Sequence, residues 1–212
     1  MARDCGQGLE PYDPRGDNTN AEISTADKEA YNDMITRNLT RLKDYTNQLL
    51  TVFKIEETSG KLFLSTVPVR NLFDDILKVY DQQAQMKKLT LKFSVNPVGL
   101  MISCDREKIF QVLSNLVSNS MKFTESGSIE VAAKATKKDV LFSVSDSGAG
   151  IPKEDLPYVF DRFFKGHKAI NTKGSGLGLT IAKAWVEAHG GKIWAESNGF
   201  NQGTNFFFSL SI

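Results

Sequence analysis

The stretch "DREKIFQVLSNLVSNSMKF", residues 105–123, combines a continuous apolar face with a polar face of an unusual kind. Asp105 is a typical N-cap residue and marks the start of a helix. Apolar residues then recur at helical spacing and form the face that we expect to be buried: Ile109, Val112, Leu113, Leu116 and Val117. The stretch therefore predicts one strong amphipathic helix that packs on a core.

The polar face of this helix carries two asparagines, Asn115 and Asn119, which are four residues apart and so share one side, with Lys122 close by. Asparagine is a poor helix former, so two in the middle of a helix indicate a specific role. An amide oxygen suits Mg²⁺, which also takes oxygens from phosphate and water, and a neighbouring lysine can meet phosphate charge. A solvated polar stripe is the alternative, and this helix alone does not decide between the two.

The segments around this helix are predicted to form one α/β domain. Strand patterns occur at 62–69, 89–95, 99–104, 128–136, 139–146, 192–198 and 204–212. Helical spacing predicts further helices at 69–80 and 179–189. A few helices with a largely antiparallel sheet predict an α+β fold, specifically a two-layer α/β sandwich.

The N-terminal part of the chain has a different character. Residues 1–24 are rich in Gly, Pro, Asp and Asn and are expected to be a flexible leader. A long helix is predicted over 25–60, with Gly60 as a left-handed cap, and the α/β domain over 61–212. Apolar or small residues of the helix step by four and three, as in a heptad seam: Ile35, Leu39, Leu42, Thr46, Leu49 and Phe53. This pattern favours lengthwise packing on another helix over an ordinary amphipathic helix on a core.

Composition excludes several classes of protein. The 212-residue chain is 41% hydrophobic and 24% charged, which are ordinary values for a soluble globular protein. Its formal net charge of +1 gives no general attraction to nucleic acid or to an anionic membrane. No apolar run approaches the roughly 20 residues that span a bilayer, and the N-terminal stretch lacks the apolar region of a secretory signal. The 2 cysteines and 2 histidines suggest neither a disulfide framework nor a helix-spaced zinc site, and reduced cysteines fit a cytoplasmic domain.

A second motif, "DSGAGI" at 146–151, follows the strand predicted at 139–146. The carboxylate of Asp146 can accept a hydrogen bond from an exocyclic amine, which would favour adenine over guanine at that place. Gly148 and Gly150 would let the backbone approach a planar ligand closely. A plain turn is the alternative, because Asp-Ser-Gly is common turn chemistry.

A third motif, "GSGLGL" at 174–179, opens the helix predicted at 179–189. Glycines at 174, 176 and 178 free backbone N–H groups, and the positive end of the helix dipole lies beside them, as in a phosphate-binding loop. The pattern is not a P-loop, because no Gly-Lys-Ser/Thr follows the last glycine. It is not a dinucleotide fingerprint either, because its spacing differs and no early strand–helix–strand unit surrounds it.

The segment between the two glycine motifs is rich in phenylalanine. Phe160, Phe163 and Phe164 bracket Arg162 and Lys165. The polar, glycine-flanked remainder, up to the glycine loop, is predicted to be a mobile lid. Core packing is the alternative role for at least one of the phenylalanines.

Together the asparagine helix, the Asp-Gly-Gly turn, the Phe-Arg-Phe-Phe segment and the triple-glycine loop follow the order of the N, G1, F and G2 boxes. Residues from about 60 to 212 therefore resemble the catalytic and ATP-binding domain of bacterial-type sensor histidine kinases, within the gyrase, chaperone, kinase and mismatch-repair ATPase superfamily. This resemblance implies the Bergerat-type fold, with a mixed, mostly antiparallel sheet and helices on one face. Residues from about 28 to 57 resemble the second helix of that family's dimerisation hairpin.

The resemblance implies ATP and Mg²⁺ as ligands and assigns roles to matching residues. Asn119 matches the Mg²⁺ ligand, and Asn115 the position near the γ-phosphate and its water. Lys122 matches a phosphate-contacting lysine, Arg162 the arginine that stabilises the transferring phosphate, and Asp146 the aspartate that reads adenine. The other residues placed around the nucleotide are Gly148, Gly150, Phe160, Lys165, Gly174, Gly176, Leu177 and Gly178. Positioning and charge neutralisation are what phosphoryl transfer mainly needs, so this set is chemically sufficient.

One departure from the family is large. The family's phosphoacceptor is a histidine on the first dimerisation helix, and neither His167 nor His189 lies in such a place. The resemblance therefore implies transfer of the γ-phosphate to a histidine supplied by another segment or chain. The expected partners are a histidine-bearing dimerisation domain or intact kinase and a response regulator receiver domain, with neither nucleic acid nor membrane contacted by this chain itself. We expect the isolated chain to be a monomer or a non-native dimer, and its place to be cytoplasmic, either free or as part of a membrane-bound sensor.

Two alternatives remain open on the sequence. One is a degenerate nucleotide-binding regulatory module, although Asn119 and the loop glycines are all present. The other is a related superfamily ATPase, which would carry a glutamate base one turn before the Mg²⁺ ligand, where this chain has Asn115. The remaining departures are conservative: Ser120 replaces the usual alanine, and Ser147 stands where threonine is common.

Overall fold

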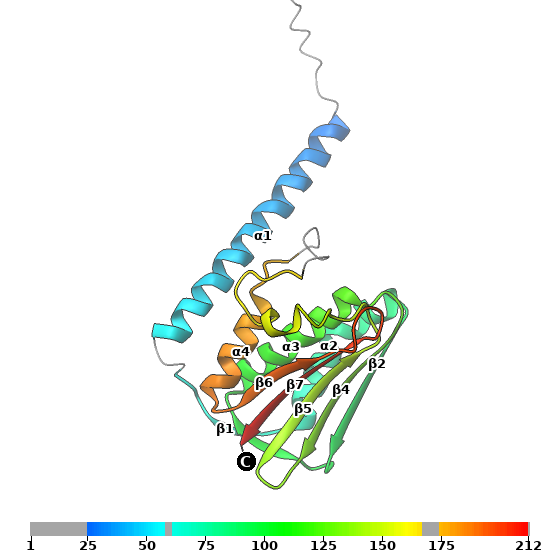
Figure 1. Cartoon of the computed structure of the whole chain (residues 1–212). Helices are drawn as coiled ribbons and strands as arrows, with labels where there is room; N and C mark the ends of the chain where they lie inside the picture. The colour runs from blue at the N-terminus through cyan, green and yellow to red at the C-terminus, as the bar shows by residue number, and fades with distance from the viewer. Residues whose placement is uncertain (1–24, 58–60, 167–173, 212) are drawn as a thin grey trace, which may run out of the picture. The chain divides into compact units, whose positions relative to one another are not determined.

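The computed structural model describes residues 25–57, 61–166 and 174–211 (Figure 1). The chain divides into two compact units, Met1–Leu42 and Lys43–Ile212, which we describe separately. Helix α1 (Thr25–Glu57) begins in the first unit and ends in the second. The leader predicted at 1–24 and the cap predicted at Gly60 lie outside the described residues.

The long helix predicted near the N-terminus is confirmed as α1. Its heptad positions Ile35 and Leu39 in the first unit are 52% and 61% exposed. In the second unit, Ile55 is buried in the hydrophobic core and Leu49 packs partly against it. None of the helices among the described residues is both long and apolar enough for a membrane span. The assignment of α1 to a dimerisation hairpin stays a prediction.

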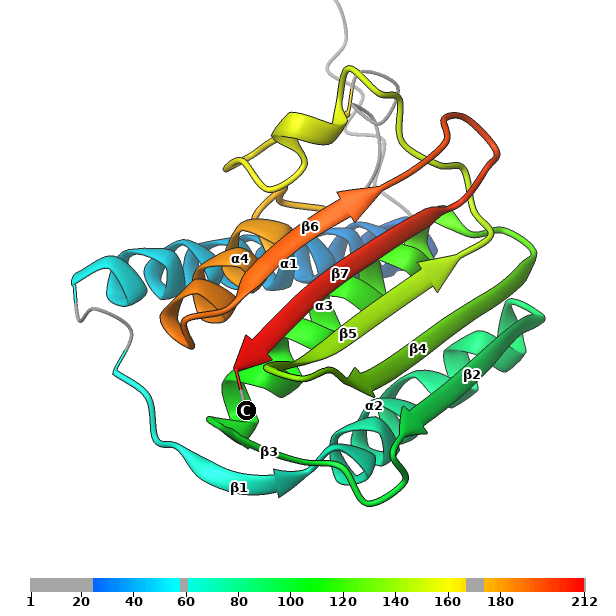
Figure 2. The same ribbon diagram turned by 60° about the horizontal axis from the view of Figure 1, so that its bottom comes forward.

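The second unit is built on a five-stranded sheet with the order β2-β4-β5-β7-β6 (Figure 2). The strands are β2 (Leu89–Asn96), β4 (Gly127–Ala135), β5 (Asp139–Asp146), β7 (Thr204–Ser211) and β6 (Lys192–Glu196). β2 pairs with β4 in parallel, and the other three pairings are antiparallel. A separate antiparallel pair consists of β1 (Ser65–Pro68) and β3 (Met101–Cys104).

Three helices cover one face of the large sheet, as Figures 1 and 2 show. They are α2 (Val69–Met86), α3 (Arg106–Phe123) and α4 (Gly178–Ala188). A short 3₁₀ helix, Leu156–Tyr158, interrupts the loop-rich segment after β5. The predicted α+β fold, a two-layer α/β sandwich with helices on one face, is confirmed.

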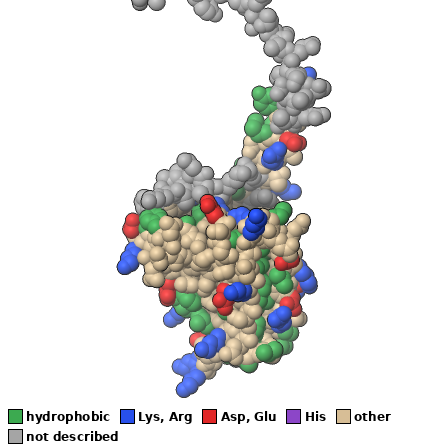
Figure 3. Space-filling model, turned by 90° about the vertical axis from the view of Figure 1, so that its right-hand side faces the viewer, with side chains coloured by type: hydrophobic (Ala, Val, Ile, Leu, Met, Phe, Trp, Pro, Cys, Tyr) green, Lys and Arg blue, Asp and Glu red, His purple; other side chains and the backbone are tan. Residues whose placement is uncertain are grey.

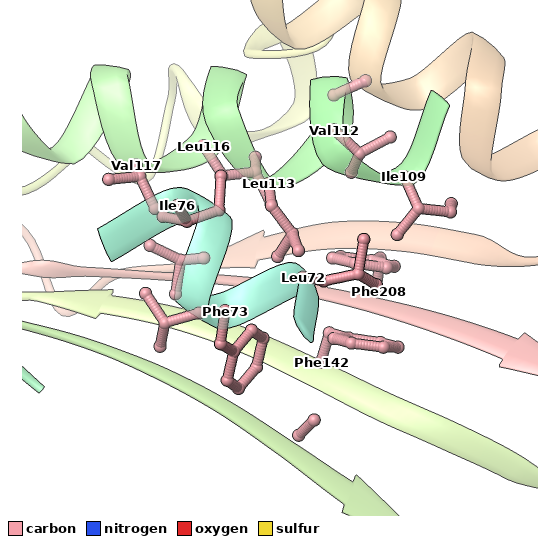
Figure 4. Close-up of a cluster of buried hydrophobic side chains, with 14 of the residues drawn as sticks. Leu72, Phe73, Ile76, Ile109, Val112, Leu113, Leu116, Val117, Phe142 and Phe208 are labelled. Carbon is pink, nitrogen blue, oxygen red and sulfur yellow. The ribbon is translucent and has the colours of Figure 1, made fainter. Parts of the chain in front are cut away.

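The hydrophobic core lies between this helical layer and the sheet (Figure 4). Leu72, Phe73 and Ile76 of α2 are buried in this core, next to the apolar face of α3 that the sequence predicted. The ring of Phe73 points to the sheet, with its centroid 6.4 Å from that of Phe142. That predicted face is fully buried: Ile109, Val112, Leu113, Leu116 and Val117. Below the helices, Phe142 of β5 and Phe208 of β7 stack with their ring centroids 4.5 Å apart. Burial of one whole face of α3 fixes which of its polar residues face outward.

Helix α3 is also anchored at its N-terminus, as predicted. The side chain of Asp105 accepts a hydrogen bond from the backbone N–H of Lys108 at 3.3 Å. The backbone N–H of Asp105 in turn donates to His189 Nε2 at 3.0 Å, which ties the start of α3 to the end of α4. His189 is thus part of the packing between these helices. Burial raises the pKa of the neighbouring Cys104 thiol to about 11, with the charge of Asp105 as a second cause.

Element boundaries differ from the predictions at a few ends. The helix predicted at 69–80 continues to Met86, because Ala84 extends its buried face by one more turn after Tyr80. The strand pattern at 62–69 becomes β1 at Ser65–Pro68 only, with Phe63 and Leu64 exposed. These differences do not move the predicted motifs from their elements.

Charged side chains of both signs are interspersed on the face drawn in Figure 3. Among the described residues seen there, no field of one sign covers the surface. This distribution agrees with the formal net charge of +1.

Candidate functional site

Helix α3 meets the glycine loop at 174–178. A Cβ atom added to Gly178 would lie 3.6 Å from Asn115 Oδ1. A Cβ atom added to Gly174 would lie 3.0 Å from Lys122 Nζ. The polar face of α3 and the loop, about fifty residues apart in the chain, therefore form one surface, with the partly buried Asn119 on the helix between Asn115 and Lys122.

The amide of Asn115 has an unused donor. Among the described residues, Asn115 Nδ2 and Thr124 Oγ1 are the buried side-chain polar atoms without a hydrogen-bond partner. A buried polar atom without a partner costs about 1–3 kcal/mol, so a ligand atom that accepts from Asn115 Nδ2 would recover that free energy. A phosphate oxygen is one such acceptor.

Positive charge gathers near the C-terminal end of α3. The pKa of Lys122 is lowered by burial first and by the charge of Lys165 second. Lys122 Nζ also lies 4.6 Å from the centroid of the Phe123 ring. Two neighbouring cations that repel each other favour an anion between them.

The N-terminus of α4 points into this region without a capping side chain. Its N-cap residue, Leu177, makes no side-chain cap hydrogen bond. The Leu177 side chain is instead buried in the core, and its backbone N–H donates to Ser175 Oγ at 3.1 Å. The first-turn N–H groups and the helix dipole therefore remain available to an anion.

The phenylalanine-rich segment is attached to the glycine loop and to α4. The backbone N–H of Phe163 donates to the carbonyl of Gly176 at 3.1 Å. A Cβ atom on Gly176, whose φ is 75°, would lie 2.8 Å from Phe163 Cα, so this glycine is required by a contact inside the chain. Thr180 Oγ1 donates to the carbonyl of Phe160 at 3.0 Å.

The predicted residues of this segment have different surroundings. Phe160 packs partly against the core, which is the structural role foreseen as the alternative for one phenylalanine. Phe163 is 56% exposed, and Arg162 and Lys165 are exposed as well. The segment is loop-rich as predicted, while the remainder of the predicted lid, at 167–173 with His167, lies outside the described residues.

Asp146 stands at the end of β5 and is held by three donors. Its Oδ1 accepts from the backbone N–H of Gly148 at 3.0 Å and of Thr204 at 3.3 Å. Its Oδ2 accepts from Ser120 Oγ at 2.8 Å. Burial raises the pKa of Asp146 above its ordinary value of 3.8, while these three hydrogen bonds act in the opposite direction. The carboxylate is therefore half-buried and fixed in direction.

The glycines after Asp146 are required by the chain itself. A Cβ atom on Gly148 would overlap the carbonyl oxygen of Phe123, and one on Gly150, with a φ of 68°, would overlap that of Gly199. The backbone N–H of Ala149 also donates to the Phe123 carbonyl at 3.0 Å. Ligand approach is the role that the sequence predicts for these glycines, and packing inside the chain is a second reason for them.

Helix α3 thus joins two groups of predicted residues. Asn115 and Lys122 lie next to the loop glycines, while Ser120 and Phe123 of the same helix contact Asp146 and the turn at Gly148. The sequence interpretation missed the bond from Ser120 to Asp146 and treated that serine only as a conservative replacement. A signal was present, because serine inside a helix competes for backbone hydrogen bonds just as asparagine does. Among the described residues, no three His, Cys, Asp or Glu side chains gather as a metal site.

Comparison with known proteins identifies the family. The sequence profile described as "Histidine kinase-, DNA gyrase B-, and HSP90-like ATPase" matches residues 104–212. The chain is 36% identical to the sensor histidine kinase WalK of Bacillus subtilis over 185 residues, which cover 84% of this chain and 30% of WalK. It is 38% identical to the sensor protein KdpD of Clostridium acetobutylicum over 165 residues, which cover 76% of this chain and 18% of KdpD. The chain therefore spans less than a third of the length of either relative.

Solved structures agree with this match. The catalytic domain of the histidine kinase ThkA superimposes with a TM-score of 0.63 at 30% identity, over 70% of this chain and 97% of that one. Full-length ShkA in complex with AMPPNP gives 0.77 at 25% identity, over 90% of this chain and 40% of that one. ThkA in complex with the response regulator protein TrrA gives 0.69 at 26% identity, over 93% and 53%. The predicted resemblance is confirmed, and the chain belongs to the histidine kinase-, DNA gyrase B-, and HSP90-like ATPase family, with the type of catalytic domain found in sensor histidine kinases.

Proposed function

We propose that this chain is the ATP-binding catalytic portion of a sensor histidine kinase and transfers the γ-phosphate of ATP to a histidine supplied by another segment or chain. The observation that carries the proposal is the reach of α3. Asn115 and Lys122 face the glycine loop, while Ser120 of the same helix bonds to Asp146 at the tip of β5. One nucleotide lying along this helix would meet both groups.

The adenine end of the proposed site is formed at Asp146. Its fixed carboxylate accepts a hydrogen bond from the exocyclic amine of adenine. Guanine carries a carbonyl at the equivalent position, and two acceptors would then face each other. The turn at Gly148 and Gly150 forms the backbone wall beside the base, with Phe160 on the segment that follows.

The phosphate end is formed by groups that favour an anion. Asn115 Nδ2 is a buried donor without a partner, Lys122 and Lys165 bring positive charge, and the uncapped N-terminus of α4 offers its amides. Asn119 supplies an amide oxygen for Mg²⁺, which together with phosphate oxygens and water suits that ion. When bound, Mg²⁺ supplies neutralisation of charge on the transferring phosphate. Arg162 is exposed on the phenylalanine-rich segment, and in this proposal it stabilises the phosphate during transfer.

The acceptor histidine lies elsewhere in this proposal. Both ring nitrogens of His189 are engaged, since Nε2 accepts from the Asp105 backbone and Nδ1 lies 2.7 Å from the Trp185 carbonyl. The acceptor would be on a dimerisation domain, with α1 as the second helix of its hairpin. By analogy with ThkA bound to TrrA, the phosphate then passes to a receiver domain of a response regulator. A cytoplasmic location and a monomeric or non-native dimeric state of the isolated chain belong to the same proposal.

A transfer assay in trans tests the proposal. The chain is mixed with a separate histidine-bearing dimerisation domain, Mg²⁺ and ATP labelled in the γ-phosphate. We expect acid-labile label on that domain, and none when its histidine is replaced by glutamine. Binding of ATP without any transfer would instead favour a regulatory module. Strong steady-state hydrolysis by the chain alone would favour the ATPase alternative, against the presence of Asn115 where a hydrolase has its glutamate.

A further inference from the structure

Ser120 differs from the other polar residues of α3 in its surroundings. It is only 1% exposed, whereas Asn115 and Asn119 are partly exposed and Lys122 is exposed. A buried hydroxyl needs a hydrogen-bond partner, and Ser120 has Asp146 Oδ2 at 2.8 Å. The bond joins α3 to the tip of β5.

The donors around Asp146 are of two kinds. Oδ1 accepts from two backbone N–H groups, those of Gly148 and Thr204, which any sequence with this backbone would supply. Oδ2 accepts from a side chain, so that bond depends on the residue at position 120. A carboxylate has about four lone-pair sites, and three are used here, so capacity for one more donor remains.

We propose that Ser120 is a positioning residue for nucleotide selection, which holds the Asp146 carboxylate in the orientation that accepts the exocyclic amine of adenine and disfavours guanine. This inference rests on the proposed ATP site and deepens it. Without the hydroxyl, Oδ2 loses its side-chain donor and the carboxylate can rotate about its last bond away from the base. Ser120 itself touches neither phosphate nor base in this proposal.

A cycle of two nucleotides and two proteins measures the effect. The nucleotides are ATP and purine riboside triphosphate, which carries a hydrogen in place of the exocyclic amine, both with Mg²⁺. The proteins are the full chain and its Ser120→Ala variant, and the dissociation constant is measured by calorimetric titration. We expect ATP to bind about tenfold more weakly to the variant. The hydrogen bond from the adenine amine to the charged Asp146 carboxylate is of the strong kind, and it weakens when the carboxylate loses its orientation. Purine riboside triphosphate should bind both proteins equally, within about twofold, because it has no amine for Asp146 to accept.

Two further variants separate positioning from folding. Ser114→Ala removes a hydroxyl from the same helix, one bonded to Tyr80 and remote from Asp146, and should leave both affinities unchanged. Ser120→Cys fills nearly the same volume with only a weak donor. If Ser120→Ala unfolds, Ser120→Cys is measured in its place, at a temperature at which it is folded. It should lose part of the affinity for ATP and none of that for purine riboside triphosphate.

The outcomes distinguish this inference from the proposed function. Equal losses for both nucleotides, or full ATP affinity in the Ser120 variants, would overturn the role of Ser120 while leaving ATP binding intact. If the unaltered chain binds ATP and purine riboside triphosphate equally well, Asp146 does not read the amine and both claims about adenine are wrong. If it binds neither, the proposed function itself fails.

Discussion

The two glycine-containing turns of the domain differ in what fixes them. At the tip of β5, side chains on Gly148 or Gly150 would overlap backbone carbonyl oxygens of the chain itself. Asp146 in the same turn is held by three hydrogen bonds. This turn has its shape before any ligand binds.

The loop at 174–178 is less constrained. Only Gly176 is pressed against other backbone. Gly174 has a φ of 144°, which favours glycine, but a Cβ there would meet only the flexible end of Lys122, and Gly178 leaves ordinary room beside Asn115. The Asn115 amide nitrogen lacks a partner, and burial and neighbouring charge lower the pKa of Lys122. The turn that we propose to read the base is thus fixed by the fold, whereas the proposed phosphate end has groups that a ligand would complete. The substitutions below should therefore affect folding at the first turn and ligand-dependent steps at the second.

The largest effect is expected for Asn119→Ala at the phosphate end. Removing a preorganised group that stabilises transferring charge should lower transfer to an external histidine by roughly 10²–10³-fold. The free energy of unfolding should change by less than about 0.5 kcal/mol, because the side chain is only partly buried. Single-turnover transfer and denaturant unfolding measure the two quantities.

Ser118→Ala on the exposed side of the same helix is the control for Asn119→Ala and should leave both quantities unchanged. Transfer at the original rate in the Asn119 variant would remove this residue from the magnesium role. A large loss of folding free energy would show that the phosphate end is structural, as the turn at the tip of β5 is.

Next in size is the contrast between Gly150→Ala and Gly178→Ala in folding free energy. Gly150 has a φ of 68° and no room for a Cβ, so alanine there should lower the free energy of unfolding by about 3 kcal/mol. Gly178 begins α4 with room for a Cβ, so alanine there should change it by no more than about 1 kcal/mol. Urea unfolding of the two variants measures the difference, and equal losses would contradict it.

A smaller effect is expected for Asp146→Asn on nucleotide selection. The variant keeps the size of the side chain but replaces an acceptor by an N–H donor, so ATP should bind about 10–100-fold more weakly. Affinity for purine riboside triphosphate should be nearly unchanged, since that nucleotide has no amine to lose. Loss of both affinities together would mean that Asp146 maintains the fold of the turn and does not read the base.

Much of the fold was predictable from local pattern. The apolar face behind Asp105 predicted α3 to its last residue, and the strand pattern of a hairpin pair predicted β5 with both of its ends. The parallel pairing of β2 with β4 was not predictable in this way, because it joins strands separated by β3 and α3. Alternation indicates that a strand has a buried face and says nothing about its neighbours.

The site was predictable in its members and less so in its reasons. Asn115 could be chosen because asparagine is unusual in the middle of a helix, and Lys122 because it lies close to the same face. Asp146 could be chosen because it is an acceptor at the end of a strand, followed by two glycines. The glycines at 150 and 178 look alike in sequence, yet only Gly150 is required by packing, against Gly199 far along the chain. The partnership of Ser120 with Asp146 likewise depends on how α3 lies against the tip of β5, which no local pattern contains.

The smallest expected effect is the pH dependence of adenine recognition. Burial raises the pKa of Asp146 above 3.8, and the groups that face its carboxylate from the turn, α3 and β7 are uncharged donors, namely Gly148, Ser120 and Thr204. The ionised carboxylate is the better acceptor of the amine proton, so ATP affinity should be constant well above this raised pKa and fall as the pH drops through it. At the pKa itself half of the molecules are competent, and the apparent affinity should be about twofold lower.

Purine riboside triphosphate separates this effect from titration of the phosphates, whose own pKa lies at about 6. Both nucleotides lose affinity when their phosphates are protonated, so this effect cancels in the ratio of the dissociation constant of purine riboside triphosphate to that of ATP. Protonation of the adenine ring at low pH changes the ratio in both proteins, so Asp146→Asn is the control for it. We expect the ratio to fall more steeply with decreasing pH in the unaltered chain than in Asp146→Asn. The contribution of Asp146 to the free energy of unfolding of the unbound protein should rise as the pH falls, because a carboxyl whose pKa is raised on folding adds stability as the pH falls through that pKa. The same pH dependence of this ratio in both proteins, over the range where the domain stays folded, would mean that the carboxylate does not contact the amine. The turn at the tip of β5 would then be preformed for packing alone.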